Sequence, residues 1–290
     1  MRLVVCIIIF IAARLVQAES VVPAAELPIK FQEGLLWVEV QVPQSKKPLN
    51  FLLDTGASAS VVNLSTARRL GFKLGDRVRV SGVKTDTTGY WPVKVSAKVE
   101  SSHSTKEIEL PAEYLALDLS KLSGSCNCSV DGLLGADFFR DRVVEIDYAA
   151  EKLRMLDSAP SVADANVIPL EIRPCGFRVP LTVNGISNQW VRVDTGCATA
   201  LQWVTTKVRA DRCMMSKPAV GLAELSIPQT MTGVGMGSRF LDTVPTGLHR
   251  KEIFPGESGL LGNGLLAQFG VVIIDAKASR LILLKTGTGR

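Results

Sequence analysis

Two copies of the tripeptide Asp-Thr-Gly have the residue types for chemistry, one at 54–56 and one at 194–196. Each copy closes an apolar run, LNFLLDTG in the first and QWVRVDTG in the second. A carboxylate at the end of a buried strand is costly unless another group holds it. Two carboxylates side by side share one proton, because like charges disfavour the second ionisation, and they supply an acid and a base at one pH. We therefore expect Asp54 and Asp194 to face one another.

Such a pair suits the hydrolysis of a peptide bond. The ionised carboxylate takes a proton from water, the water attacks the carbonyl, and the protonated carboxyl stabilises the oxyanion and later helps to protonate the leaving amine. Gly56 and Gly196 let each turn bring its amides near the carboxylates. The hydroxyls of Thr55 and Thr195 are expected to hydrogen-bond across the interface between the turns. This chemistry requires no cofactor and no metal.

The elements that must position these turns also recur. One Asp-Thr-Gly is ordinary, whereas two copies with the same order of flanking segments indicate an internal duplication. The matching pairs are LPIKF (27–31) with IPLEI (168–172), DGLLGADFF (131–139) with SGLLGNGLL (258–266), and VVEIDYAAEKLRML (143–156) with VVIIDAKASRLILL (271–284). Between the halves, the polar segment SAPSVADAN at 158–166 is typical of a linker. The prediction is an N-terminal lobe over 19–157 and a C-terminal lobe over 167–290.

Composition favours strands within each lobe. Hydrophobic residues make up 47% of the chain and aromatic residues only 6%, and short runs rich in Val and Ile alternate with Gly and Pro. LLWVEVQV at 35–42 and FRVPLTV at 177–183 alternate as strands do. Asn63 is placed to cap a short helix at 64–70, with Gly71 at its end. We expect a mainly β fold with two similar lobes about an approximate two-fold axis.

The first eighteen residues, MRLVVCIIIFIAARLVQA, have the pattern of a secretory signal peptide. Their apolar run is too short to span a bilayer of about 30 Å, although retention as an N-terminal anchor is the alternative. We expect export to the periplasm or the extracellular space, without stable membrane insertion after cleavage. Removing Arg2 and Arg14 leaves 31 basic and 28 acidic residues, a net charge of +3. With no dense basic run, this charge gives no reason to expect nucleic-acid binding.

The numbers and spacing of cysteine and histidine residues bear on metal binding, nucleophilic catalysis and disulfide formation. The two histidines, His103 and His249, lack metal-ligand spacing and make a Ser-His-Asp or Cys-His arrangement unlikely. Outside the signal segment the number of cysteines is odd, so at least one thiol is free or pairs outside the chain. These cysteines are Cys126, Cys128, Cys175, Cys197 and Cys213. The sequence does not determine which of them pair in disulfides.

FLLDTGASASVV and WVRVDTGCATAL resemble the active-site turns of the aspartic proteases, and DGLLG and SGLLG resemble that family's hydrophobic-hydrophobic-Gly segment. The spacing is closest to the retropepsin-like group, in which two subunits with one Asp-Thr-Gly each dimerise. The resemblance implies two acid-protease-like β-barrel lobes with a cleft between them, and a catalytic dyad of Asp54 and Asp194. It also implies a peptide or protein substrate and a monomer that acts as an internal pseudo-dimer. We interpret the chain as an aspartic-type endopeptidase.

The resemblance further implies hairpin flaps that close over the substrate. In the first lobe the candidate is VSGVKTDTTGYWPV at 80–93, with its tip near Thr88-Gly89. In the second lobe, TGVGMGSR at 232–239 is rich in glycine as a mobile tip would be, and a plain flexible loop is the alternative. The candidate flap residues are Gly89, Tyr90, Gly233 and Gly235.

Two departures from the family pattern bear on the dyad. Ala57 and Cys197 follow the turns where the pepsin branch usually has Ser or Thr, whose hydroxyl hydrogen-bonds the carboxylate. Without that donor the dyad should be less acidic, so we expect activity at mildly acidic to neutral pH. Cys197 is interpreted as a small filler, with a redox-sensitive thiol as the alternative. Arg192 is expected to be solvated at its strand edge, with an effect on the dyad or a contact with substrate as alternatives.

Two other functions compete with proteolysis. A catalytically silent protein could bind peptides on the same fold, because fold does not fix function. A glycosidase also uses two carboxylates, but it does not need two copies of one turn. The intact aspartates and threonines favour the endopeptidase.

Overall fold

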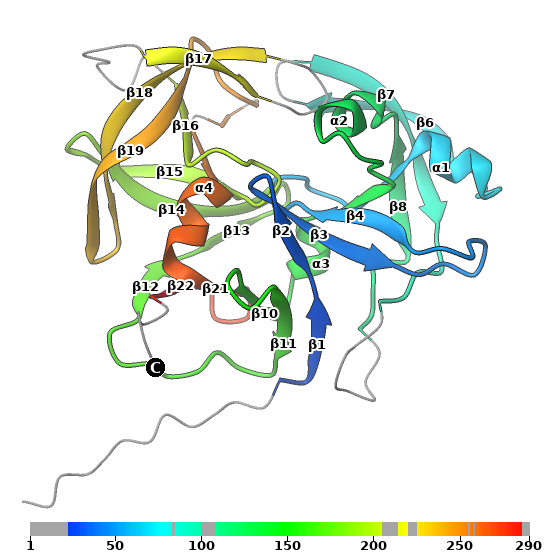
Figure 1. Cartoon of the computed structure of the whole chain (residues 1–290), viewed down its shortest axis with the longest axis horizontal. Helices are drawn as coiled ribbons and strands as arrows, with labels where there is room; N and C mark the ends of the chain where they lie inside the picture. The colour runs from blue at the N-terminus through cyan, green and yellow to red at the C-terminus, as the bar shows by residue number, and fades with distance from the viewer. Residues whose placement is uncertain are drawn as a thin grey trace, which may run out of the picture.

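The computed structural model describes residues 23–82, 85–99, 108–204, 214–219, 225–254, 256–257 and 259–285. Over these residues the chain forms two eight-stranded sheets and one six-stranded sheet, with short helices between them. Figure 1 shows the sheet of the first half on the right and that of the second half on the left. The predicted mainly β fold class is confirmed.

The first-half sheet contains the strand that leads into Asp54. Its central pairs β4–β9 and β5–β8 are parallel, and its other neighbours are antiparallel. In order across the sheet the strands are β2 (Lys30–Gln32), β3 (Leu35–Val40), β4 (Leu49–Leu53), β9 (Gly132–Leu134), β5 (Val61–Asn63), β8 (Glu113–Leu117), β7 (Thr85–Lys94) and β6 (Asp76–Gly82).

The second-half sheet repeats this order strand for strand. Its parallel pairs are β15–β20 and β16–β19, in the same places across the sheet, and β14 also pairs with β18. The order is β13 (Glu171–Arg173), β14 (Gly176–Val183), β15 (Ile186–Asp194), β20 (Gly259–Gly262), β16 (Leu201–Val204), β19 (Arg239–His249), β18 (Leu225–Met236) and β17 (Met214–Ala219). The expectation of two similar β-rich lobes is therefore confirmed.

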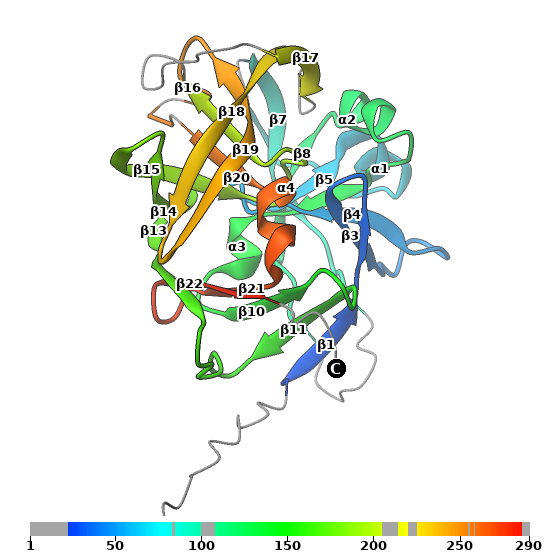
Figure 2. The ribbon, with the colours of Figure 1, turned by 60° about the vertical axis from the view of Figure 1, so that its left-hand side comes forward.

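A six-stranded sheet joins the lobes and takes three strands from each half. Its order is β1 (Ala25–Pro28), β11 (Lys152–Leu156), β10 (Val143–Asp147), β21 (Gly270–Asp275), β22 (Arg280–Lys285) and β12 (Asn166–Pro169). The halves meet at β10 and β21, which pair antiparallel from Val143–Asp275 to Asp147–Val271. Figure 2 shows this sheet on the lower side of the molecule, with α3 (Ala136–Phe139) and α4 (Asn263–Leu266) above it.

Short helices follow the strands that carry the recurring segments. α1 (Leu64–Arg69) begins as predicted, because the Asn63 side chain accepts a hydrogen bond from Ser65 N, and Gly71 follows it at φ +72°. None of the helices in the described part is long and apolar enough to cross a membrane. The others are α2 (Ser120–Ser125) and the 3₁₀ helix η2 (Ala267–Phe269).

The recurring Gly-Leu-Leu segments form β9 and β20, which lie beside the strands that carry the aspartates. A Cβ atom on Gly132 would lie 2.3 Å from the Phe51 ring, and one on Gly259 would lie 2.6 Å from Val191. Glycine is required at both places because the neighbouring side chain fills the space. This close packing holds β4 and β15 on rigid structure.

Candidate active site

Both aspartates stand where a central strand ends. Asp54 directly follows β4, and its main-chain N–H donates to Leu134 O at 2.8 Å. Asp194 is the last residue of β15 and pairs with Gly262 in the parallel strand β20. Strands fixed on both sides position a side chain more accurately than a loop does. The two carboxyl groups are therefore held by the cores of the two lobes.

The two turns bring the carboxyl groups together. A Cβ atom on Gly56 would lie 2.4 Å from Asp194 Cγ, and one on Gly196 would lie 2.5 Å from Asp54 Cγ. Each glycine therefore leaves the space that the opposite carboxyl group occupies. Each of the two carboxyl groups lies close enough to the other to change its pKa. The predicted pairing of the two carboxylates is present in the structure.

Thr55 and Thr195 fasten the turns to one another. Thr55 N donates to Thr195 Oγ1 at 3.0 Å, and Thr195 N donates to Thr55 Oγ1 at 3.1 Å. The Thr55 hydroxyl donates to Val193 O at 2.8 Å, and the Thr195 hydroxyl donates to Leu53 O at 2.7 Å. All these bonds are buried, which makes them costly to break. They are the hydrogen bonds across the interface that the sequence leads one to expect.

The backbone solvates the two carboxylates unequally. Asp54 Oδ1 accepts from Gly56 N at 3.0 Å and from Ala57 N at 3.1 Å. Asp194 Oδ1 accepts from Gly196 N at 3.0 Å. The next amide in that turn, Cys197 N, donates to the main-chain oxygen of Asp194 at 3.2 Å, as Ala57 N also does to that of Asp54 at 3.1 Å, but it makes no described bond to the Asp194 carboxylate. Asp54 therefore receives one more donor than Asp194 in the described hydrogen bonds.

Burial raises the pKa of both carboxyl groups. For Asp54 the amides of Ala57 and Gly56, the neighbouring Asp194 carboxyl and the charge of Arg192 oppose that rise. For Asp194 burial and the nearby charge of Asp54 raise the pKa well above its ordinary value, and Arg192 opposes them. The pair thus retains a proton at pH values where exposed carboxyl groups have lost theirs.

Neither residue after the turns donates a side-chain hydrogen bond to the dyad. Ala57 has no donor, and Cys197 Sγ lies 3.1 Å from Thr199 Oγ1 and 3.4 Å from Gln202 Nε2. Cys197 is 8% exposed, and burial raises the pKa of its thiol to about 12. A thiol this weakly acidic is a poor nucleophile at neutral pH. These properties support the interpretation of Cys197 as a filler.

The first candidate flap is a hairpin, but its expected tip is wrong. Thr88 and Gly89 lie inside the ladder of β6 and β7, where they pair with Arg79 and Val78. The ladder extends as far as the pair Gly82 and Thr85, and residues 83–84 lie outside the described residues. A Cβ atom on Gly89 would lie 2.6 Å from Leu117 Cδ2, so this glycine serves packing against β8. Its neighbour Tyr90 pairs with Ala116 of β8.

The second candidate flap is an anchored turn and not a mobile tip. Residues 232–239 run from β18 through a turn into β19. Asn166 of β12 donates to Met236 O at 2.8 Å and accepts from Ser238 N at 2.9 Å. Gly233 and Gly235 lie within β18, and both approach the ring of Phe240. By its place in the sheet, the equivalent of the first-lobe pair β6–β7 is β17–β18, and residues 220–224 lie outside the described residues.

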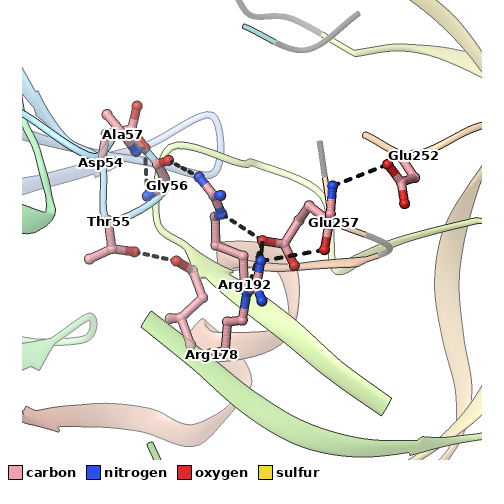
Figure 3. A network of polar contacts seen from close by, with 10 residues as sticks. Asp54, Thr55, Gly56, Ala57, Arg178, Arg192, Glu252 and Glu257 are labelled. Carbon is pink, nitrogen blue, oxygen red and sulfur yellow. Dashed lines mark hydrogen bonds and ion pairs between the residues drawn. The ribbon is translucent and has the colours of Figure 1, made fainter. Parts of the chain in front are cut away.

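Arg192 is the residue that the sequence interpretation placed wrongly. It is 6% exposed, and not solvated at a strand edge. Its Nη1 donates to Gly56 O at 2.8 Å, and its Nε donates to Glu257 at 3.0 Å. Arg178 binds the same Glu257 oxygen at 2.8 Å. Figure 3 shows this line of contacts, which reaches from the second lobe to the turn of Asp54. A sequence signal existed, since Arg192 interrupts an apolar strand where the first lobe has Leu52.

Several other expectations concern residues that the structure leaves out. The predicted signal peptide at 1–18, His103 and Cys213 lie outside the described residues. Within the described part, Cys126, Cys128, Cys175 and Cys197 are free thiols. Within the same part, no group of three or more His, Cys, Asp and Glu could hold a metal ion.

Comparison with known proteins gives a family for part of the chain and a fold for nearly all of it. Residues 38–138 match a family model described as aspartyl protease, and this segment contains the Asp54 turn and the first Gly-Leu-Leu strand. A search of curated proteins gave no match. The crystal structure of basic 7S globulin from soybean is similar with a TM-score of 0.50 and 13% sequence identity, covering 91% of this chain and 95% of that one. At that identity the globulin shows the fold alone, and the match over 38–138 shows a similarity of that segment to the aspartyl protease family model.

Proposed function

We propose that the protein is an aspartic endopeptidase that hydrolyses peptide bonds with a water molecule activated between Asp54 and Asp194. The observation that carries the proposal is the pairing of two Asp-Thr-Gly turns, each of whose glycines leaves room for the opposite carboxyl group. The family match over 38–138 supports the same reaction type.

In the proposed reaction the ionised member of the dyad accepts a proton from the attacking water. The protonated member donates to the carbonyl oxygen as the tetrahedral intermediate forms, and it later supplies a proton for the leaving amine. The four hydrogen bonds of Thr55 and Thr195 keep the two carboxyl groups at a fixed separation while the proton moves. The raised pKa values keep one proton on the pair.

The proposal also includes an internal duplication of the chain and its export from the cell. The strand-for-strand match of the two eight-stranded sheets supports an internal duplication, with lobes over 19–157 and 167–290 and a linker at 158–166. Residues 1–18 act as a signal peptide in this proposal, and the exported chain works as a monomer on peptide or protein substrates. Each lobe supplies one aspartate of the dyad, so a single chain is sufficient to form the proposed site.

The decisive test compares cleavage of a mixed peptide library by residues 19–290 and by Asp54→Asn and Asp194→Asn. We expect cleavage by the parent and a loss of about a hundredfold or more in each variant, because each removes a group that transfers a proton. Asp164→Asn is the matched control, since Asp164 is an exposed carboxylate in the segment between the lobes.

The other outcomes are equally informative. Cleavage that survives either substitution in the dyad would contradict the two-aspartate mechanism. Peptide binding without cleavage by all variants would instead identify a catalytically silent peptide-binding protein on this fold. Folding of each variant is checked by thermal unfolding, so that loss of activity is not confused with loss of structure.

A further inference from the structure

Three charged side chains form a buried cluster behind the second active-site strand. Arg178, Arg192 and Glu257 are 8%, 6% and 1% exposed, and we call them the buried charge cluster. Glu257 Oε2 accepts from Arg178 Nε at 3.1 Å and Nη2 at 2.8 Å, and from Arg192 Nε at 3.0 Å. The Arg192 guanidinium also lies 4.7 Å from the centre of the Phe254 ring. Two cations and one anion give the cluster a net positive charge.

The fold itself does not require these charges. In the first lobe, strand register places Trp37, Leu52 and Val130 at the positions that correspond to Arg178, Arg192 and Glu257. There Leu52 and Val130 belong to one apolar cluster, and Trp37 packs against it.

Retaining the buried charge cluster carries an energetic cost. Apolar residues of similar volume often replace a buried ion cluster without loss of stability. Among the described residues, the buried oxygen Oε1 of Glu257 has no hydrogen-bond partner. The second lobe therefore retains buried charges where the first lobe has apolar residues. Stability alone does not explain why the charges are retained.

The contact that distinguishes the cluster is made to the opposite lobe. Arg192 Nη1 donates to Gly56 O at 2.8 Å. That carbonyl belongs to the same peptide group as Ala57 N–H, which donates to Asp54 Oδ1 at 3.1 Å. A cation on the carbonyl end polarises the peptide and strengthens the hydrogen bond at its N–H end. Leu52, the counterpart of Arg192, has no donor with which to act in this way on the Asp194 turn.

We propose that Arg192 is a positioning residue, which acts through the Gly56–Ala57 peptide to make Asp54 the ionised member of the dyad and Asp194 the protonated one. Its catalytic meaning rests on the proposed function. In that reaction the water oxygen bonds to the carbonyl carbon as the C=O π bond breaks. The water proton passes to Asp54, and the Asp194 proton passes to the carbonyl oxygen, so the dyad keeps one proton throughout.

The charges around the pair agree with this assignment. In the described part, the charge of Arg192 acts on both carboxyls, and burial and both carboxyls raise the pKa of the Cys197 thiol. Arg178 and Glu257 contact Arg192 or share its hydrogen-bond partner. The direct charge of Arg192 lowers the pKa of both carboxyls and is the largest lowering influence on Asp194. The proposed distinction therefore depends on the contact through the Gly56–Ala57 peptide, which reaches Asp54. The Ala57 amide is the largest influence that lowers the pKa of Asp54, against burial, which raises it. The relay therefore acts on Asp54 alone.

The test is a carboxyl ¹³C NMR titration of Asp54 and Asp194, assigned with Asp54→Asn and Asp194→Asn. In the wild type we expect Asp54 to ionise at the lower pH. In Arg192→Leu, which places the first lobe's residue at this site and leaves Glu257 paired with Arg178, Asp54 should ionise at higher pH. Earlier ionisation of Asp194 in the wild type, or an unchanged titration in Arg192→Leu, would overturn the proposal.

A second variant separates the effect of losing the Arg192 contact from the effect of leaving a buried charge unpaired. Arg178→Trp/Arg192→Leu/Glu257→Val transplants the first lobe's apolar trio, so no buried charge is left unpaired. It should fold and give the same shift in the Asp54 titration. Arg154→Leu is the matched control, because Arg154 joins Glu26 and Glu145 in an ion-pair network of the six-stranded sheet. This control should lower the Tm and leave the Asp54 and Asp194 titrations unchanged.

Activity provides an independent measurement. With cleavage established, Arg192→Leu should lower kcat by about tenfold with little change in KM, and move the acid limb of the pH profile to higher pH. An unchanged kcat and pH profile in a folded Arg192→Leu would also overturn the proposal. A wild type that cleaves no peptide would count against the proposed function alone, because the titration still reports which carboxyl is ionised.

Discussion

The residue after each Asp-Thr-Gly determines how well the carboxylates are solvated. Ala57 contributes only its amide to Asp54, and Cys197 directs its thiol toward Thr199 and Gln202. Burial consequently raises the pKa of both carboxyl groups without compensation from a side-chain hydroxyl. For a catalyst that needs one ionised and one protonated carboxyl, we therefore expect activity at mildly acidic to neutral pH.

Ala57→Ser should shift the pH profile of kcat/KM toward lower pH. A hydroxyl near Asp54 stabilises the charged form and lowers its pKa, so ionisation of Asp54, which defines the acid limb, occurs at lower pH. The measurement is kcat/KM against pH for both proteins.

Ala59→Ser, which adds a hydroxyl farther along the same turn, is the control and should leave the acid limb unchanged. A wild-type profile that peaks below about pH 3 would contradict the upward shift on which this prediction depends.

At the scale of elements, one side chain at the start of α4 connects three segments around the site. Asn263 Nδ2 donates to Gly34 O at 2.9 Å and to Thr195 O at 2.6 Å, and its Oδ1 accepts from Tyr148 OH at 2.8 Å. Asn263 is fully buried. The corresponding first residue of α3 is Ala136, so this connection exists only on one side of the dyad.

Asn263→Ala should lower the free energy of unfolding by about 1–3 kcal/mol, because it leaves buried groups without partners. Chemical denaturation measures the change. Gln268→Ala, which removes an exposed amide bound to Gly264 O, is the control and should cost much less. Adding Tyr148→Phe to Asn263→Ala should cost less than Tyr148→Phe alone; equal costs in both backgrounds would contradict the coupling.

The elements also show which features could be predicted from sequence. The dyad and α1 depend on local patterns, namely a repeated turn and the cap at Asn63, and so they are readable in the chain. Arg192 was misplaced because its partner Glu257 is 65 residues away and its burial arises only on folding. Glycine content misled the flap assignments, since Gly89 and Gly233 allow neighbouring side chains to approach rather than mark mobile tips.

At the scale of the whole molecule, the lobes meet at the six-stranded sheet and around the dyad. β10 and β21 pair at the centre of the six-stranded sheet, and the Thr55–Thr195 hydrogen bonds lie at the dyad. In the chain, the halves are connected between β11 and β12, which lie on opposite sides of that sheet. The segment that connects β11 to β12 contains neither aspartate of the dyad.

A chain divided at residue 160 should therefore regain activity when fragments 19–160 and 161–290 are mixed. Because the site forms only when the fragments associate, activity at low concentration should rise with the product of the two fragment concentrations. Titration of one fragment against the other measures this dependence. Absence of activity at every concentration, with both fragments folded, would show that the connection is needed to form the site.

The six-stranded sheet has a consequence for the order of folding during synthesis. Because β10 pairs with β21, which comes more than a hundred residues later, a nascent chain that has folded only its first lobe carries one aspartate of the proposed dyad. The order of the sequence thus delays formation of the proposed active site until the strands of the second lobe have been synthesised.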